Sequence, residues 1–108
     1  MAARTYEDLE VWRKADQVAS TVFDLTAGFP AEQHSVLVPQ MRRAALSIPA
    51  NIVEGFARRP PRDKARFYTF AEGSADELRY FLTFAVRKML RRLTDVTLGM
   101  APPRAEGR

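Results

Sequence analysis

Apolar side chains recur at three- and four-residue steps through three stretches of the chain, which predicts three amphipathic helices. The first helix is predicted from Tyr6 to Ala27, because Gly28 and Pro30 follow it as stop signals. Thr5 is expected to cap its start, with Asp8 three residues further on. Its inward face is predicted to carry Leu9, Trp12, Ala15, Val18, Ala19, Val22 and Leu25.

The second stretch predicts a helix from about Val36 to Phe56. Pro39 fits the first turn, where no intrahelical hydrogen bond is lost, but Pro49 lies in the interior and is expected to kink or break the helix. The prolines Pro60 and Pro61 then end the element in a stiff turn. The inward face is predicted to be Leu37, Met41, Ala44, Ala45, Ile48 and Ile52.

A third long helix is predicted from Asp63 to about Leu98, a stretch with no proline and with Gly73 as its one glycine. Its predicted buried stripe is Phe67, Phe70, Ala71, Ser74, Leu78, Leu82, Ala85 and Met89, and a weaker pattern continues through Leu93 and Val96. No strand-like alternation is found. The fold class is therefore predicted to be all-α, an antiparallel up-and-down bundle. We expect residues 1–98 to form the helical domain and residues 99–108, GMAPPRAEGR, to be a disordered tail.

The amino-acid composition limits the kinds of functional site that the chain can form. The 108 residues include no cysteine, which excludes disulfides and thiolate metal sites, and His34 is the only histidine. We therefore expect no metal and no cofactor. The N-terminus lacks a hydrophobic signal core, and no apolar run is long enough to span a membrane, so we expect a soluble, cytoplasmic protein with no membrane partner.

The net charge of +4 is unevenly distributed along the chain. Residues 42–66 carry seven basic and two acidic side chains, and residues 87–108 carry six and two. Only three of the 17 basic residues are lysines. Since the planar guanidinium suits bidentate contact with phosphate or carboxylate, this composition favours an anionic partner.

The order and spacing of many short matches carry a resemblance that spans residues 6 to about 90. They are Asp8-Leu9, Val11-Trp12, Lys14-Ala15, Phe29-Pro30, Leu37, Gln40-Met41-Arg42-Arg43-Ala44-Ala45, Ser47-Ile48-Pro49, Asn51-Ile52, Glu54-Gly55, Arg58, Phe67, Ala71, Gly73-Ser74, Glu77-Leu78 and Leu82. With these residues the chain resembles the small four-helix-bundle family encoded in intervening sequences of bacterial 23S ribosomal RNA genes. That family includes the accessory variability determinant of diversity-generating retroelements.

The resemblance implies an antiparallel four-helix bundle that assembles as a homopentamer with a basic surface, and for the ribosomal-insert proteins no enzymatic activity is implied. The retroelement accessory protein binds a reverse transcriptase and nucleic acid, so the resemblance implies RNA or DNA, and a reverse transcriptase or another protein, as partners. This chain departs from the pattern because only Arg91 to Met100 remains for a fourth helix. Either the third helix breaks near Leu90 and packs back, or it continues straight and leaves a groove.

Two interpretations of the basic residues stay open. They are predicted to contact nucleic acid as one patch, or to form a solvated face with partners such as Glu54, Asp63 and Glu72. The candidate residues are Arg42, Arg43, Arg58, Arg59, Arg62, Lys64 and Arg66. Glu54 lacks the second acid, base or metal that hydrolysis needs, so we expect it to pair with an arginine, and we expect no enzyme.

The aromatic residues predict self-association. Trp12 is predicted to lie in the core or a subunit interface, and Phe81 and Phe84 fall partly outside the predicted stripe, which indicates a second buried face. Two functions follow. The first is a non-enzymatic, homo-oligomeric accessory factor that binds nucleic acid through its arginines, and the second is a protein interaction scaffold without a nucleic-acid role.

Overall fold

The structure, a computed structural model, describes residues 2–99, and these form three α-helices and two short 3₁₀ turns. In chain order they are η1 (Tyr6–Asp8), α1 (Glu10–Ala27), η2 (Ala31–Gln33), α2 (Leu37–Ala57) and α3 (Pro61–Thr97). The described residues hold no strand, which confirms the all-α prediction. Of the predicted tail, residues 100–108 lie outside the described part. Between residues 2 and 99, no helix combines the length and hydropathy that crossing a bilayer requires.

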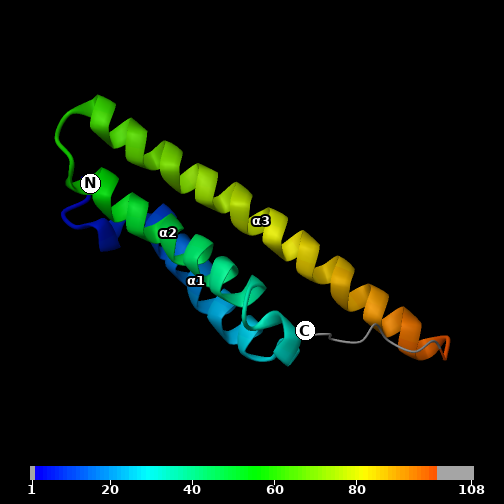
Figure 1. The fold of residues 1–108 in the computed structure, drawn as a ribbon. Helices are drawn as coiled ribbons and strands as arrows, with labels where there is room; N and C mark the ends of the chain where they lie inside the picture. Colours follow the sequence, from blue (N-terminus) through cyan, green and yellow to red (C-terminus); the bar gives the residue numbers. More distant parts are fainter. Residues whose placement is uncertain (1, 100–108) are drawn as a thin grey trace.

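The three helices form an open arrangement with α2 in the middle (Figure 1). α1 and α3 each pack against α2 and scarcely against one another. α2 runs antiparallel to both, as the short connections predict. The molecule is elongated, 59 × 23 × 17 Å, because the 37-residue α3 alone is about 55 Å long.

The core is built from small side chains on α2 and larger ones around them. Ala44 and Ala45 are fully buried beside Met41, and they let α1 and α3 approach α2 closely. A second, smaller cluster of Ala15, Ile52 and Ala71 lies further along the bundle. Every residue of the predicted inward face of α2 is buried or half-buried, so that prediction is confirmed.

The predicted inward face of α1 is wrong at two positions. Val18 and Leu25 are 43% and 51% exposed, whereas Thr26, which was not predicted, is fully buried. The reason is that α1 packs on α2 alone, so it buries only the narrow stripe of Ala15, Ala19, Val22 and Thr26. Phe70 on α3 was also predicted to be buried and is about half exposed.

The start of α1 also differs from the prediction. A continuous helix was expected from Tyr6, but η1 ends at Asp8 and Leu9 has extended backbone angles, φ −80° and ψ 124°. The Asp8 carboxylate accepts hydrogen bonds from the backbone N–H groups of Arg4 and Thr5, at 2.8 and 3.2 Å. These bonds hold the preceding turn separate from the helix, which begins only at Glu10.

The break expected at Pro49 does not occur, and α2 is continuous from Leu37 to Ala57. Pro49 is buried, and its neighbours Ala45 and Ile52 belong to the two core clusters. Packing on both sides therefore outweighs the missing backbone donor. Two residues beyond the proline, the side-chain amide of Asn51 donates to the Ser47 carbonyl oxygen at 2.8 Å.

The course of α3 decides whether the third helix breaks near Leu90 or continues straight. α3 does not break near Leu90 but runs as one helix to Thr97. Figure 1 shows it continuing past the ends of α1 and α2. Residues 2–99 therefore contain three long helices and no fourth, and the side of the bundle between α1 and α3 is open.

Candidate nucleic-acid interface

The turn between α2 and α3 is stiff and basic, and it forms one end of the molecule (Figure 1). Arg58 caps α2 with extended backbone angles, as expected so close to a proline pair, and Pro61 is the first residue of α3. Proline in that position loses no intrahelical hydrogen bond and has a suitable fixed φ. The basic side chains on either side of Pro60 are therefore carried on a backbone with little freedom.

The Lys64 side chain links the start of α3 to the end of α2. Its Nζ donates to the backbone carbonyls of Phe56 and Gly55, at 2.9 and 3.3 Å, and lies 5.5 Å from the centre of the Phe56 ring. These carbonyls belong to the last turn of α2, where the Gly55 carbonyl also accepts from the Arg58 backbone N–H at 3.3 Å, and a cation is favourable at that end of a helix. Lys64, one of the predicted contact residues, thus has a structural role in holding α3 to α2.

Two arginines lie over aromatic rings beside the turn. The guanidinium carbons of Arg58 and Arg66 are 4.7 and 5.0 Å from the centre of the Phe67 ring. Arg66 is also 5.9 Å from Phe70, which meets Phe67 edge to face at 5.7 Å. Phe70 is 48% exposed. The result is a surface on which guanidinium planes and an accessible aromatic ring alternate.

Arg59 and Arg62 differ from their neighbours because they are exposed and make no ion pair with any described residue. Arg58, in contrast, pairs with Glu54 at 3.0 Å. That pair agrees with the expectation that Glu54 serves an arginine. We call Arg58, Arg59, Arg62, Arg66 and the rings of Phe67 and Phe70 the turn patch.

Arg42 and Arg43 do not belong to the turn patch, although the sequence grouped them with it. They lie 16 and 15 residues before Arg58, the residue that follows α2, which is about 24 and 22 Å along the helix. The Arg42 guanidinium contacts α1 through Thr26 and Phe23, and Arg43 pairs with Glu77 of α3 at 2.7 Å. Both side chains are therefore engaged within the fold.

Comparison with known protein families identifies the family of this chain. A scan against protein-family models matches residues 7–95 to the family described as 23S rRNA-intervening sequence protein. The chain belongs to this family. The match covers all three helices except the end of α3, and a search of curated proteins finds no significant match.

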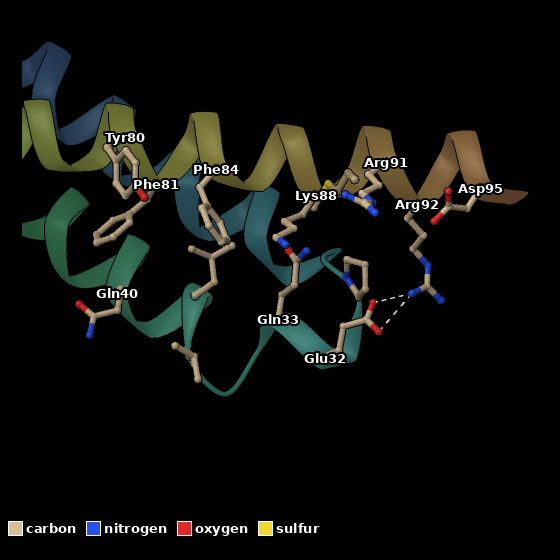
Figure 2. Close-up of a pocket in the computed structure, with 14 residues that line it drawn as sticks. Glu32, Gln33, Gln40, Tyr80, Phe81, Phe84, Lys88, Arg91, Arg92 and Asp95 are labelled. Atoms are coloured by element: carbon tan, nitrogen blue, oxygen red, sulfur yellow. Dashed lines mark hydrogen bonds and ion pairs between the residues drawn. The ribbon is translucent and has the colours of Figure 1, made fainter. Parts of the chain in front are cut away.

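A second basic and aromatic surface of this 23S rRNA-intervening sequence family member lies at the other end of α3. It borders a groove of about 780 Å³ between α3 and the segment from η2 to the start of α2 (Figure 2). Tyr80, Phe81 and Phe84 line the groove, and Lys88 and Arg92 extend it. Arg92 is bound to Glu32 at 2.7 Å, and Asp95 lies nearby, so acidic groups offset part of the positive charge here.

The three predicted interface residues make contacts within their own chain. Trp12 packs against the cluster of Ala15, Ile52 and Ala71 and meets Tyr6 edge to face at 4.9 Å. Phe81 and Phe84 are half-buried, and Phe81 packs against the main core cluster. Their role in self-association stays a prediction.

The structure also shows how the possible metal ligands are placed. Between residues 2 and 99, no group of three histidine, cysteine, aspartate or glutamate side chains is placed to hold a metal ion. The His34 ring lies 2.8 Å from the Phe29 carbonyl oxygen, a local contact within the α1–α2 connection. Leu93 and Val96, which were predicted to continue the buried stripe of α3, are 61% and 60% exposed, so that part of the prediction is wrong. Sequence reasoning also missed the exposed apolar residues Val86 and Leu90 on α3 and Val11 on α1.

Proposed function

We propose that this protein is a non-enzymatic accessory factor that binds nucleic acid through the turn patch. The observation that carries the proposal is the position of Arg59 and Arg62, which are exposed at a stiff turn without an ion pair among the described residues. Arginines in that state have guanidinium groups available for phosphate oxygens. The family description, which links these proteins to sequences inserted in ribosomal RNA genes, is consistent with an RNA-related role.

The aromatic part of the turn patch favours single-stranded nucleic acid. Phe70 is half exposed and lies next to Arg66, and base stacking on an accessible ring is a sequence-tolerant source of affinity. The arginines would bind the backbone while the ring takes a base. Binding of this kind depends steeply on salt and only weakly on sequence.

A protein interaction scaffold is the second candidate. The groove in Figure 2 supports it, because Tyr80 is 56% exposed and the aromatic residues beside it offer apolar surface to a protein partner. In that case the arginines of the turn patch would keep the protein soluble. A reverse transcriptase or another protein partner belongs to this alternative.

The test is a fluorescence anisotropy titration with a short labelled RNA of mixed sequence, at about 50 and 200 mM salt. Arg59→Ala with Arg62→Ala should weaken binding at low salt. It should also reduce the slope of log affinity against log salt by about 1.4, since each single-strand phosphate contact contributes about 0.7. The same titration with DNA of equal sequence shows whether the affinity depends on the sugar of the nucleic acid.

Arg87→Ala with Arg91→Ala is the matched control, because it removes the same charge from the far end of α3. Equal weakening by both double variants would mean that binding follows net charge and not the turn patch. Absence of RNA binding by the unaltered protein at low salt would leave the scaffold as the better function.

A further inference from the structure

The arginines of α3 that have no ion pair lie along one face of the helix. Arg79 and Arg92 pair with acidic residues. The others are exposed and make no ion pair with any residue between 2 and 99; they are Arg62, Arg66, Arg87 and Arg91. An α-helix turns by about 100° per residue, so these four positions lie within about 60° of one another around the helix axis. The available guanidinium groups therefore form a line along α3.

This line has a cationic end at the turn patch, a second cationic end, and an uncharged middle. Arg87 lies about 31 Å beyond Arg66 along the helix. Between them, Gly73 and Tyr80 follow Arg66 at steps of seven residues, so they share its face approximately. A Cβ on Gly73 would meet nothing within 4 Å, so the surface there is open. We call Tyr80, Arg87 and Arg91 the distal contact.

The Tyr80 ring is accessible and held in place by its neighbours. It is 56% exposed, and its centre lies 5.9 Å from that of Phe81 and 6.3 Å from that of Phe84. Figure 2 shows Tyr80 and Phe84 on successive turns of α3. The guanidinium carbon of Arg87 is 5.7 Å from the centre of the Phe84 ring. The distal contact thus repeats the combination of exposed ring and guanidinium that Phe70 and Arg66 provide in the turn patch.

Acidic side chains do not interrupt the line. Glu77 is bound to Arg43 at 2.7 Å, and Asp76 lies 3.8 Å from Arg79. Glu72 is displaced from the position of Arg62 by about 80° around the helix. Asp95, one turn beyond Arg91, is buried. An anionic chain that lies on this face therefore meets cations at both ends and no unpaired carboxylate directly beneath it.

We propose that a single nucleic-acid strand bound at the turn patch continues along α3 and is held again by the distal contact. This second contact rests on the function proposed above, since the turn patch provides the first one. From Arg62 to Arg91 the line measures about 43 Å. At the stacked spacing of about 3.4 Å per nucleotide, a strand of about 13 nucleotides covers it. The preferred ligand is therefore a single strand of about that length.

The exposed ring of Tyr80 favours a single strand over a duplex. Both ligands carry phosphates, so the arginines alone do not distinguish between them. In a duplex the bases are paired and stacked on one another, whereas an unpaired base can be splayed out and stacked on an aromatic side chain. A ring that lies between two sets of arginines on one face suits a strand whose bases are free to turn toward the protein.

Fluorescence anisotropy with labelled RNAs of about 4 and about 16 nucleotides tests the distal contact. The short RNA covers the turn patch alone, and the long RNA reaches both ends of the line. Arg87→Ala with Arg91→Ala should reduce the slope of log affinity against log salt by about 1.4 for the long RNA, since each single-strand phosphate contact contributes about 0.7. The same double variant should leave the binding of the short RNA unchanged.

Arg13→Ala with Lys14→Ala is the charge-matched control for the long RNA. Both residues are exposed on α1, which packs on α2 and scarcely contacts α3. This control removes the same charge as the distal double variant but leaves the line on α3 intact. The slope for the long RNA should therefore stay at the value of the unaltered protein. Circular dichroism of each variant shows that the helices are retained.

Tyr80 provides a readout that does not depend on charge. Tyr80→Ala should weaken the long RNA about tenfold through the loss of one stacked base, and Tyr80→Phe should retain the affinity. Neither change should affect the short RNA. A duplex RNA with the same number of base pairs should bind more weakly than the long single strand and should not respond to Tyr80→Ala.

The results separate the distal contact from the proposed function. A smaller slope confined to the long RNA, together with the loss in Tyr80→Ala, supports the distal contact. Binding of the short RNA with an unchanged slope for the long RNA in Arg87→Ala with Arg91→Ala would overturn the distal contact alone. Equal reduction by the α1 control, or a duplex bound as tightly as the single strand, would also overturn it. Absence of binding to both RNAs would remove the proposed function as well.

Discussion

The Nε atom of Arg42 donates a hydrogen bond of 2.9 Å to the hydroxyl of Thr26, which ties α2 to the last turn of α1. The Thr26 hydroxyl in turn donates to the Val22 carbonyl at 2.7 Å, and the same guanidinium donates to the Phe23 carbonyl at 3.2 Å. Carbonyls at the end of a helix attract a cation. A fully buried hydroxyl and a half-buried guanidinium thus satisfy one another.

Arg42→Ala should lower the free energy of unfolding by about 1.5–3 kcal/mol, since hydrogen bonds to charged groups contribute that much. The Thr26 hydroxyl oxygen would lose the hydrogen bond that it accepts from Arg42. Urea unfolding followed by circular dichroism measures the loss. Arg43→Ala is the neighbouring control, and its exposed pair with Glu77 should contribute only about 0–1 kcal/mol. Equal losses for the two variants would contradict a structural role specific to Arg42.

Gly55 and Gly73 should respond in opposite directions to alanine. A Cβ on Gly55 would lie 2.5 Å from the Tyr68 ring, so Gly55→Ala must displace that ring or the helix and should cost about 1–3 kcal/mol. A Cβ on Gly73 would meet nothing within 4 Å, and Gly73→Ala in the middle of α3 should stabilise by about 0.5–1 kcal/mol. Thermal unfolding of both variants decides the matter, and a stabilised Gly55→Ala would show that Tyr68 does not pack as described.

Asp8 should make the start of the chain sensitive to acid. The backbone N–H groups of Arg4 and Thr5, together with the charge of Arg13, hold the pKa of the Asp8 carboxyl below its ordinary value. Because the folded pKa is the lower one, the stabilisation is present above the ordinary carboxyl pKa of about 3.9 and is lost as the pH falls through the folded pKa. An NMR titration should show the Thr5 amide following Asp8, and in Asp8→Asn this dependence should disappear.

The periodicity of α2 was enough to predict its buried face, because α2 contacts both other helices and so follows the rule of an inward stripe closely. The same rule failed for Val18 and Leu25. The local sequence of α1 does not indicate that one side of this helix lacks a neighbouring helix. An apolar residue that faces the open side of the bundle has the same spacing as one that faces a helix. Burial of Thr26 was likewise hidden, because it depends on Arg42 sixteen residues away.

Part of the candidate site was predictable for a similar reason. The turn patch comes from residues close together in the chain around two prolines, so its arginines could be grouped from sequence alone. Arg42 and Arg43 were included because they are basic, although their direction is set by Thr26 and Glu77 on other helices. The alternation of Arg58 and Arg66 with Phe67 was not predicted, since it depends on the side-chain directions of residues on both sides of the turn.

The hydroxyls of Ser47 and Ser74 should be coupled across the α2–α3 interface. Ser74 donates to the Ser47 hydroxyl oxygen at 2.7 Å, and that oxygen also accepts from the Asn51 amide at 2.9 Å. Each single change to alanine leaves a half-buried partner without its bond and should cost about 1 kcal/mol, whereas the double change removes both polar groups and should cost less than the sum. Urea unfolding of the four proteins gives the coupling directly, and additive losses within about 0.3 kcal/mol would mean that water replaces the missing hydroxyl.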